Sequence, residues 1–308
     1  MKISIISPVY GAETIVAELV SRISNVMDSL SFDYEIILVE DGSPDKSWDE
    51  IEQVCSNNKL VSGIKLSRNF GQHYAITAGL HTTTGDAVIV MDCDLQDNPK
   101  YIPILIDEWK KGNDIVYTKK KERKHSWIKN FTARLFNLIF NYLVDNKSWE
   151  NSVSIGSYSL LSRKVVDSFL SVKDYRRHYL MVLRWLGYSY SIIEIQHEER
   201  FAGKSSYNLS KLIVHALDGI TSQSDKLLKL TMVLGFVIST ISFLAAIVVV
   251  SLAIYTNFSH GWSSLFVLIL FIGGLIISSI GISGIYIGKI YEQSKGRPLY
   301  IIEKRLNL

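Results

Sequence analysis

The stretch Asp92–Asp97, DCDLQD, places three carboxylates directly after the apolar run AVIVM. Carboxylates this close repel one another and raise each other's pKa unless a cation or a basic group neutralises them. Asp92 and Asp94 are separated by one residue, and this spacing lets both reach a hard divalent cation that takes its other ligands from diphosphate and water. An Asp-x-Asp pair is also frequent by chance. The residues alone therefore leave two interpretations, a metal and nucleotide site or a solvated acidic turn.

The elements around this stretch predict where it lies. Five short apolar runs alternate with helix-like segments: ISIISPVY, YEIILVED, SGIKLS, DAVIVMD and NDIVYT, with helices expected at 13–30, 45–57, 72–82 and 99–111. Such alternation predicts an α/β domain with a mostly parallel sheet and helices on both faces. Ligands bind these sheets beyond the carboxyl ends of the strands. Glu40 and Asp41 end one predicted strand, and Asp92 with Asp94 end another.

A long region without charge follows in the last third of the chain. From Leu230 to Gly288 there is no Asp, Glu, Lys or Arg. A short loop divides it into segments near 230–255 and 263–288, each longer than the roughly 20 residues that cross a bilayer core. A buried helical hairpin in a soluble protein is the alternative. Basic residues flank both outer ends and the loop has only His260, so the positive-inside rule predicts cytoplasmic termini and a multi-pass protein of the inner, cytoplasmic membrane.

The cysteine content and the N-terminal sequence agree with a cytoplasmic location of the charged part of the chain. Cys55 and Cys93 are isolated, so neither a disulfide framework nor a zinc site is predicted. The opening MKISIISPVYG turns polar too early for a signal peptide. The net charge of +3 says little, but residues 117–130 form a dense basic stretch. That stretch is either a solvated loop or an attractor of lipid phosphates, nucleotide phosphates or nucleic acid.

Two amphipathic segments precede the predicted membrane spans. In residues 127–143 an apolar stripe has helical spacing, and it faces either a protein core or the bilayer surface. A second candidate covers residues 206–220. The expected organisation is a cytoplasmic domain at 1–229 that includes both interface helices, a transmembrane hairpin at 230–288 and a cytoplasmic tail at 289–308.

Seven motifs, in order along nearly the whole chain, resemble the polyprenyl-phosphate glycosyltransferases of glycosyltransferase family 2. They are SPVYGAE, VEDGSPD, LSRNFGQHYAITAGL, GDAVIVMDCDLQDNP, LLSRKVVD, RFAGKSSYNLSKL and YEQSKGRPLY. The resemblance implies a GT-A catalytic domain, a nucleotide-sugar donor, Mg²⁺ or Mn²⁺, a polyprenyl phosphate acceptor in a membrane, and a homo-oligomer, namely a tetramer. It implies no nucleic-acid partner. Because of this family resemblance, we prefer the interpretation of the acidic stretch Asp92–Asp97 as a metal and nucleotide site.

The resemblance also implies roles for individual residues. The nucleotide-binding set is Pro8, Tyr10, Glu13, Asp41, Asp92, Arg200, Lys204 and Ser205, with Asp41 expected to contact the base. The catalytic and metal-binding set is Asp92, Asp94 and Gln96. The acceptor set is Arg123, Arg134 and Ser157. Purely structural alternatives remain for Pro8 as a turn residue, for Tyr10 as a packing residue and for Arg200 as an ion-pair partner.

The chain departs from the family pattern at the acceptor side. Where relatives commonly have Gly-Asp-Phe-Arg, this sequence has Gly156, Ser157, Tyr158 and Ser159. A phosphate monoester has its second pKa at about 6, so the lipid phosphate is already largely a dianion at neutral pH and needs no base to attack. Ser157 is therefore expected to alter acceptor or sugar fit more than it removes catalysis.

Three functional hypotheses follow. The leading one is inverting transfer of one sugar to polyprenyl phosphate at the cytoplasmic membrane face, for cell-envelope glycan modification. A UDP-sugar is the favoured donor and GDP-mannose the other candidate. The second hypothesis is transfer to a hydroxyl of a lipid-linked oligosaccharide, which needs a general base that Ser157 makes harder to nominate. The third is a noncatalytic membrane scaffold, against which the intact Asp92, Asp94, Gln96 and Arg200 argue.

Overall fold

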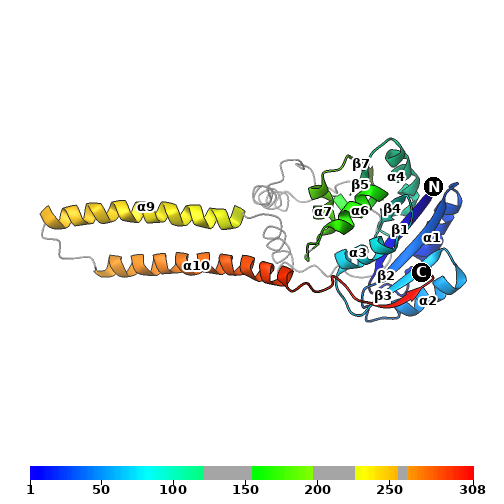
Figure 1. The fold of residues 1–308 in the computed structure, drawn as a ribbon, viewed down its shortest axis with the longest axis horizontal. Helices are drawn as coiled ribbons and strands as arrows, with labels where there is room; N and C mark the ends of the chain where they lie inside the picture. Colours follow the sequence, from blue (N-terminus) through cyan, green and yellow to red (C-terminus); the bar gives the residue numbers. More distant parts are fainter. Residues whose placement is uncertain (121–154, 176, 197–225, 256–261) are drawn as a thin grey trace. The chain divides into compact units, whose positions relative to one another are not determined.

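A computed structural model describes residues 1–120, 155–175, 177–196, 226–255 and 262–308 of the chain (Figure 1). The chain divides into two compact units. The first contains the described residues up to 196 together with 296–308, and the second contains helices α9 (Lys226–Tyr255) and α10 (Trp262–Ser294). The predicted interface helices at 127–143 and 206–220 lie outside the described residues, and their existence stays a prediction.

An eight-stranded sheet with the order β7-β5-β6-β4-β1-β2-β3-β8 organises the first unit. The strands are β1 (Lys2–Val9), β2 (Asp33–Glu40), β3 (Val61–Leu66), β4 (Ala87–Val90), β5 (Ile115–Lys120), β6 (Ile155–Ser162), β7 (Tyr190–Ile195) and β8 (Ile302–Leu306). Strands β4, β1, β2 and β3 are parallel neighbours, and β5 is parallel to β7. Strand β6 is antiparallel to both β4 and β5, and β8 is antiparallel to β3. The predicted α/β class with a mostly parallel, GT-A-like sheet is confirmed.

Helices cover both faces of this sheet. They are α1 (Val16–Asp28), α2 (Ser47–Asn57), α3 (Gln72–Thr82), α4 (Ile102–Lys110) after a 3-10 turn at Pro99–Tyr101, α6 (Arg163–Ser171) and α7 (Tyr179–Leu186). Alternate residues of β1 show the two layers: Ile5 belongs to the core cluster that includes α1 and α2, whereas Ile6 faces α3. A Cβ at Gly79 of α3 would lie 2.5 Å from Ile6 Cγ2. Burial on both faces explains why the central strands are continuous apolar runs in the sequence.

The second unit consists of two long helices. Within α10, Phe271–Ser294 has 24 residues and includes an 18-residue window with a mean hydropathy of 1.8, so it is long and apolar enough to cross a membrane, by length and composition. Among the described residues this is the one stretch that meets those criteria. Helix α9 has 30 residues and carries no charged side chain after Lys229. The prediction of two spans is thus supported at α10 and stays a prediction at α9.

The C-terminal residues differ from the predicted division. Residues 296–308 belong to the unit that contains the sheet, and not to a separate tail. Strand β8 pairs with β3, and Asn307 Nδ2 donates to the carbonyl oxygens of Cys55 at 2.7 Å and Val61 at 2.8 Å. The sequence IEKRL is charged because β8 is an edge strand that faces solvent, and charged side chains protect such an edge from further pairing.

Asn307 provides a test of this attachment. Its φ of 55° lies in the left-handed region, so Asn307→Gly keeps the backbone conformation but removes both hydrogen bonds. We expect Asn307→Gly to lower the free energy of unfolding of the sheet unit by about 1–3 kcal/mol, because each bond contributes about 0.5–1.5 kcal/mol. Asn307→Ala should lower it further because of backbone strain. Denaturant unfolding of the full chain measures both. The control, Lys304→Ala, removes an exposed ion pair at 3.7 Å and should change little.

Candidate active site

The loops that follow four parallel strands form a pocket of about 350 Å³ at the carboxyl edge of the sheet. Its lining residues are Pro8, Val9, Tyr10, Asp41, Asn69, Gly71, Gln72, Asp92, Cys93 and Asp94. The strand order brings these loops together because β4, β1, β2 and β3 lie side by side and point the same way. The predicted crevice is therefore present, and it contains Asp41, Asp92 and Asp94.

Asp92 is oriented by two side chains from other elements. Gln72 Nε2, on the first residue of α3, donates to Asp92 Oδ1 at 2.6 Å. Ser157 Oγ, on β6, donates to the same oxygen at 2.9 Å. Both donors are neutral, so they fix the direction of the carboxylate without cancelling its charge. An oriented anion of this kind suits the binding of a cation.

Asp94 lies in a tight turn just after β4. Its Oδ1 accepts a hydrogen bond at 3.1 Å from the backbone N–H of Gln96, which forms a turn closed by the aspartate side chain. Between them Leu95 has a φ of 59°, an uncommon conformation for a residue with a Cβ. The Leu95 side chain is buried, and this burial holds the turn in place. The side chain of Gln96 is not among those that line the described pocket, so its contact with the metal stays a prediction.

Cys93 separates the two aspartates and also lines the pocket. Burial raises the pKa of its thiol to about 12; the charges of Asp92 and Asp94 add to this, and a backbone hydrogen bond at Tyr10 opposes it. The thiol therefore stays protonated at neutral pH. A protonated thiol is a poor nucleophile. A hard cation such as Mg²⁺ or Mn²⁺ prefers oxygen ligands to sulfur, so the predicted ligands of this segment are the aspartates.

Asp41 holds the loop that leads into α3. It is 3% exposed, its Oδ1 accepts from Phe70 N at 2.7 Å, and its Oδ2 accepts from Gly71 N at 2.9 Å. Burial raises the pKa of Asp41, although these two backbone hydrogen bonds oppose the shift. Since Gln72 comes next in the chain, this clamp determines where Gln72 begins α3. Each carboxylate oxygen of Asp41 can accept a second hydrogen bond besides the one from the backbone. The predicted contact of Asp41 with a nucleotide base therefore stays a prediction.

Gly42 lets the two loops approach each other closely. Its φ is +64°, and a Cβ there would lie 2.2 Å from Asn69 N and 2.4 Å from the carbonyl carbon of Arg68. Real atoms do not approach this closely, so any side chain at position 42 would push the 68–71 loop away. The Asp41 clamp therefore depends on this glycine.

The first two loops are tied together beside the pocket. The backbone N–H of Ala12 donates to Ser47 Oγ at 2.9 Å, and that of Glu13 donates to Asp45 Oδ2 at 3.2 Å. In return, Lys46 N donates to Glu13 Oε2 at 3.0 Å. Glu13 is not among the described residues that line the pocket, so its observed contacts connect loops. Its predicted role in nucleotide binding stays untested.

The remaining predicted site residues divide into two groups. Pro8 and Tyr10 line the pocket, and Tyr10 is 54% exposed there. The basic residues of the donor and acceptor sets lie outside the described residues: Arg123, Arg134, Arg200 and Lys204, together with Ser205. Ser157, predicted on the acceptor side, donates to Asp92, the predicted metal ligand.

Sequence reasoning did not single out Gln72 or Asn69 as site residues. Asn69 lies in the loop that follows β3, and Gln72 is the first residue of α3, directly after Gly71. That position is the signal that could have found Gln72, because helix starts after parallel strands face the ligand crevice.

The donor set fits a hard divalent cation. Within the described parts of the chain, no group of three or more His, Cys, Asp or Glu side chains forms a metal site. The pair Asp92 and Asp94 supplies carboxylate oxygens only. Mg²⁺ and Mn²⁺ accept such ligands and complete their shells with phosphate oxygens and water, whereas structural zinc sites use four protein ligands rich in Cys and His.

A mostly parallel sheet with an acidic pocket at its carboxyl edge is typical of α/β proteins that bind ligands beyond their strand ends. Residues 4–170 match the model of the family described as Glycosyl transferase family 2. The chain belongs to glycosyltransferase family 2, and the resemblance found in its motifs is confirmed.

Two relatives match over almost their whole length. The bactoprenol glucosyl transferase of Shigella phage SfX is 36% identical over 307 residues, which cover 99% of this chain and 100% of that protein. The undecaprenyl-phosphate 4-deoxy-4-formamido-L-arabinose transferase of Proteus mirabilis is 33% identical, over 98% of this chain and 93% of that protein.

A solved structure shares the fold. Glucosyl-3-phosphoglycerate synthase from Mycobacterium tuberculosis, in complex with Mn²⁺ and UDP-glucose, superposes with a TM-score of 0.50 at 17% identity. The match covers 71% of this chain and 77% of that one. At this identity the likeness concerns the fold alone.

The close approach at Gly42 gives a matched pair of variants. Gly11 has nearly the same φ, +63°, but has nothing within 4 Å of where its Cβ would be. Gly11→Ala should therefore cost only backbone strain, about 1–2 kcal/mol. Gly42→Ala should cost clearly more and weaken binding of the sugar nucleotide at least tenfold, because the clash displaces the loop that carries Gln72. Denaturant unfolding and calorimetric titration with the nucleotide check this, and equal effects of the two variants would contradict it.

Asp45 gives a pH-dependent prediction. Burial pulls its pKa upward, but hydrogen bonds from Ser47 and from the backbone of Glu13 outweigh burial and lower it below 3.8. A lowered folded-state pKa contributes stability that is present above the unfolded-state pKa and is lost as the pH falls through the folded-state pKa. The stability gap between wild type and Asp45→Asn should therefore close below about pH 4. Thermal unfolding across a pH series measures it, with the exposed Asp49→Asn as control, and a constant gap would refute the assignment.

Proposed function

We propose that this protein transfers one sugar, with inversion, from a nucleotide sugar to polyprenyl phosphate at the cytoplasmic face of a membrane. The observation that carries the proposal is the pair Asp92 and Asp94 at the pocket, with Asp92 oriented by Gln72 and Ser157. The printed activities of the two relatives support the acceptor class, because those proteins match over nearly the whole chain.

A UDP-sugar is the proposed donor. The pocket of about 350 Å³ lies within the usual size range of small-molecule sites, about 300–1,000 Å³. The half-exposed ring of Tyr10 at the pocket can stack on a base. The Mycobacterium synthase was solved with Mn²⁺ and UDP-glucose, so the shared fold can accommodate these ligands.

Asp92 and Asp94 would hold the divalent cation, which when bound stabilises negative charge on the diphosphate leaving group. An oxygen of the acceptor phosphate forms a bond to the anomeric carbon from the opposite side. The bond from that carbon to the diphosphate oxygen breaks, and the nucleoside diphosphate leaves with the electron pair. Gln72 and Ser157 keep Asp92 in a fixed direction, so the leaving group stays in line.

The carboxylates of the pocket favour a phosphate acceptor over a hydroxyl acceptor. A sugar hydroxyl requires a general base, whereas a phosphate dianion does not. The carboxylates among the described lining residues are Asp41, Asp92 and Asp94. Asp41 is the buried loop clamp and the other two form the proposed metal pair, so the described lining assigns no carboxylate to a base. A noncatalytic scaffold is disfavoured because the acidic pair is present and oriented.

The membrane arrangement belongs to the same proposal. It comprises two spans, cytoplasmic termini in the inner membrane and a homo-oligomer, a tetramer by family resemblance. The span at α10 and the absence of charge in α9 after Lys229 support the membrane part.

Sugar transfer by membranes that contain the protein tests the proposal. With radiolabelled UDP-sugars, we expect label in the polyprenyl-phosphate fraction, loss of label in chelator and recovery with Mn²⁺. Asp92→Ala and Asp94→Ala should each reduce transfer by about 100-fold or more, since each removes a ligand of the ion that stabilises the leaving group. The control is Asp107→Ala, an exposed carboxylate on α4, which should retain activity. Label only on longer glycans would support the hydroxyl acceptor, and no transfer from any nucleotide sugar would support the scaffold.

A further inference from the structure

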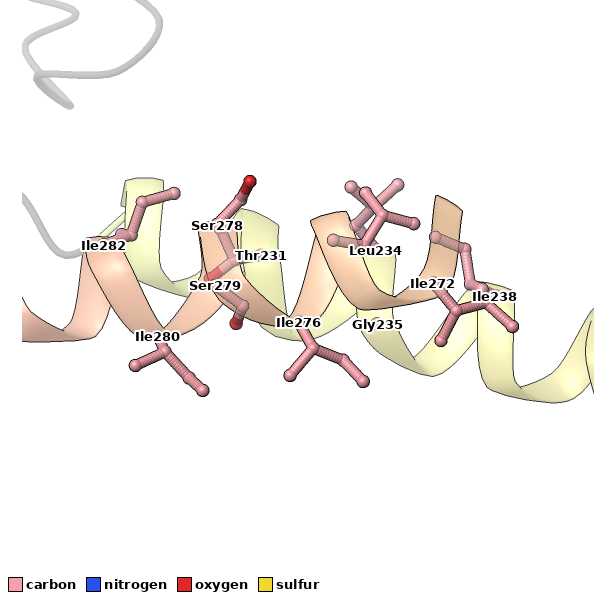
Figure 2. A pocket seen from close by; sticks show the side chains of 11 residues that line it. Thr231, Leu234, Gly235, Ile238, Ile272, Ile276, Ser278, Ser279, Ile280 and Ile282 are labelled. Atoms are coloured by element: carbon pink, nitrogen blue, oxygen red, sulfur yellow. The ribbon is translucent and has the colours of Figure 1, made fainter. Parts of the chain in front are cut away.

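An apolar groove runs between the two long helices (Figure 2). Its volume is about 570 Å³. Leu234, Gly235 and Ile238 of α9 line it together with Ile272, Ile276 and Ile280 of α10. Because residues near the start of α9 share the groove with residues toward the end of α10, the two helices are antiparallel there.

The groove offers little hydrogen bonding to an occupant. Thr231 Oγ1 donates to the carbonyl of Leu228 at 2.8 Å, and Ser278 Oγ donates to the carbonyl of Gly274 at 2.8 Å. These hydroxyls are used within their own helices, a common arrangement for Ser and Thr in apolar helices. The surface presented to an occupant is therefore apolar, and a hydrocarbon suits it better than a polar ligand.

Gly235 keeps the groove open. A Cβ at this position would meet nothing within 4 Å. A larger side chain at this position would start from open space and occupy part of the groove. Gly235 thus offers a way to fill the groove and leave the helix contacts in place.

Positive charge gathers at one end of the groove. Lys226 and Lys229 begin α9, and Thr231 is two residues further, about 3 Å along the helix. On α10, Lys289 follows Ile282 by seven residues, about 10 Å. Three lysines, with one acidic residue, Glu292, lie beyond this end of the groove and its lining is mostly apolar, so the groove complements a ligand with an anionic head and a hydrocarbon chain.

We propose that this groove binds the isoprene units nearest the headgroup of polyprenyl phosphate, with the phosphate toward the lysine end. The inference rests on the proposed function, which supplies the class of lipid. A phosphate monoester carries a charge of about −1.5 to −2 at neutral pH, which draws it to the lysines. In the proposed homo-oligomer, contacts between copies are expected outside this groove, because a second hairpin seated in it in the same membrane orientation would bring its own lysines to the same level.

Two acceptors of different chain length test the groove in the full-length protein reconstituted in nanodiscs. Gly235→Leu should raise KM for undecaprenyl phosphate by about tenfold or more, and leave the kcat/KM for methyl phosphate, which has no isoprene chain, unchanged. Ser279→Leu fills the groove from α10 and should have the same effect on each acceptor as Gly235→Leu. The control is Gly281→Leu, which also has open space at its Cβ but does not line the groove, and it should change neither value. Equal effects on both acceptors, or none, would overturn the inference.

Native mass spectrometry adds a readout that needs no catalysis. Undecaprenyl phosphate bound to wild type should be lost in Gly235→Leu and kept in Gly281→Leu, while phosphatidylglycerol adducts stay equal in all three. Parallel loss of phosphatidylglycerol would show an ordinary lipid groove and contradict the proposal, as would efficient disulfide formation between copies of Gly235→Cys. If wild type transfers sugar to neither acceptor, the proposed function fails, and the mass measurement still decides whether the groove binds the lipid.

Discussion

The buried carboxylate of Asp41 is the contact on which the geometry of the site depends. It accepts the backbone N–H groups of Phe70 and Gly71, and the neighbouring Gly42 allows the loops to approach closely enough for this. The clamp sets the start of α3, and Gln72 then reaches Asp92. A carboxylate is costly to bury, and burial raises the pKa of Asp41, while its two backbone hydrogen bonds oppose that shift.

The same edge of the sheet concentrates negative charge, and described side chains and backbone groups orient that charge. Neutral donors, Gln72 and Ser157, fix Asp92, while Asp94 accepts the N–H of Gln96. Burial raises the pKa of Cys93, and a hard cation prefers the aspartate oxygens to a thiol in any case. What remains is an oxygen-only pair beside a pocket of nucleotide size, and family membership agrees with this chemistry.

Local patterns in the sequence predict much of this arrangement. Apolar periodicity places β1–β5 and α1–α4, and the rule for parallel sheets places the acidic residues at one edge. Contacts between distant segments are not visible in that way. Ser157 meets Asp92 only because β6 pairs antiparallel with β4, with Val90 opposite Ser159. The charged β8 resembles a solvated tail in sequence, since an edge strand lacks the two-sided burial that makes central strands apolar.

The central claim is that Asp92 and Asp94 bind one divalent ion together with the diphosphate of a sugar nucleotide. Titration of the purified protein with Mn²⁺ in the presence of UDP, followed by electron paramagnetic resonance, measures this directly. We expect one tightly bound Mn²⁺ per chain. Its binding should depend on UDP and should be lost in the Asp92→Ala, Asp94→Ala double variant. Undiminished Mn²⁺ binding by that variant, or no bound Mn²⁺ in wild type with UDP, would contradict it.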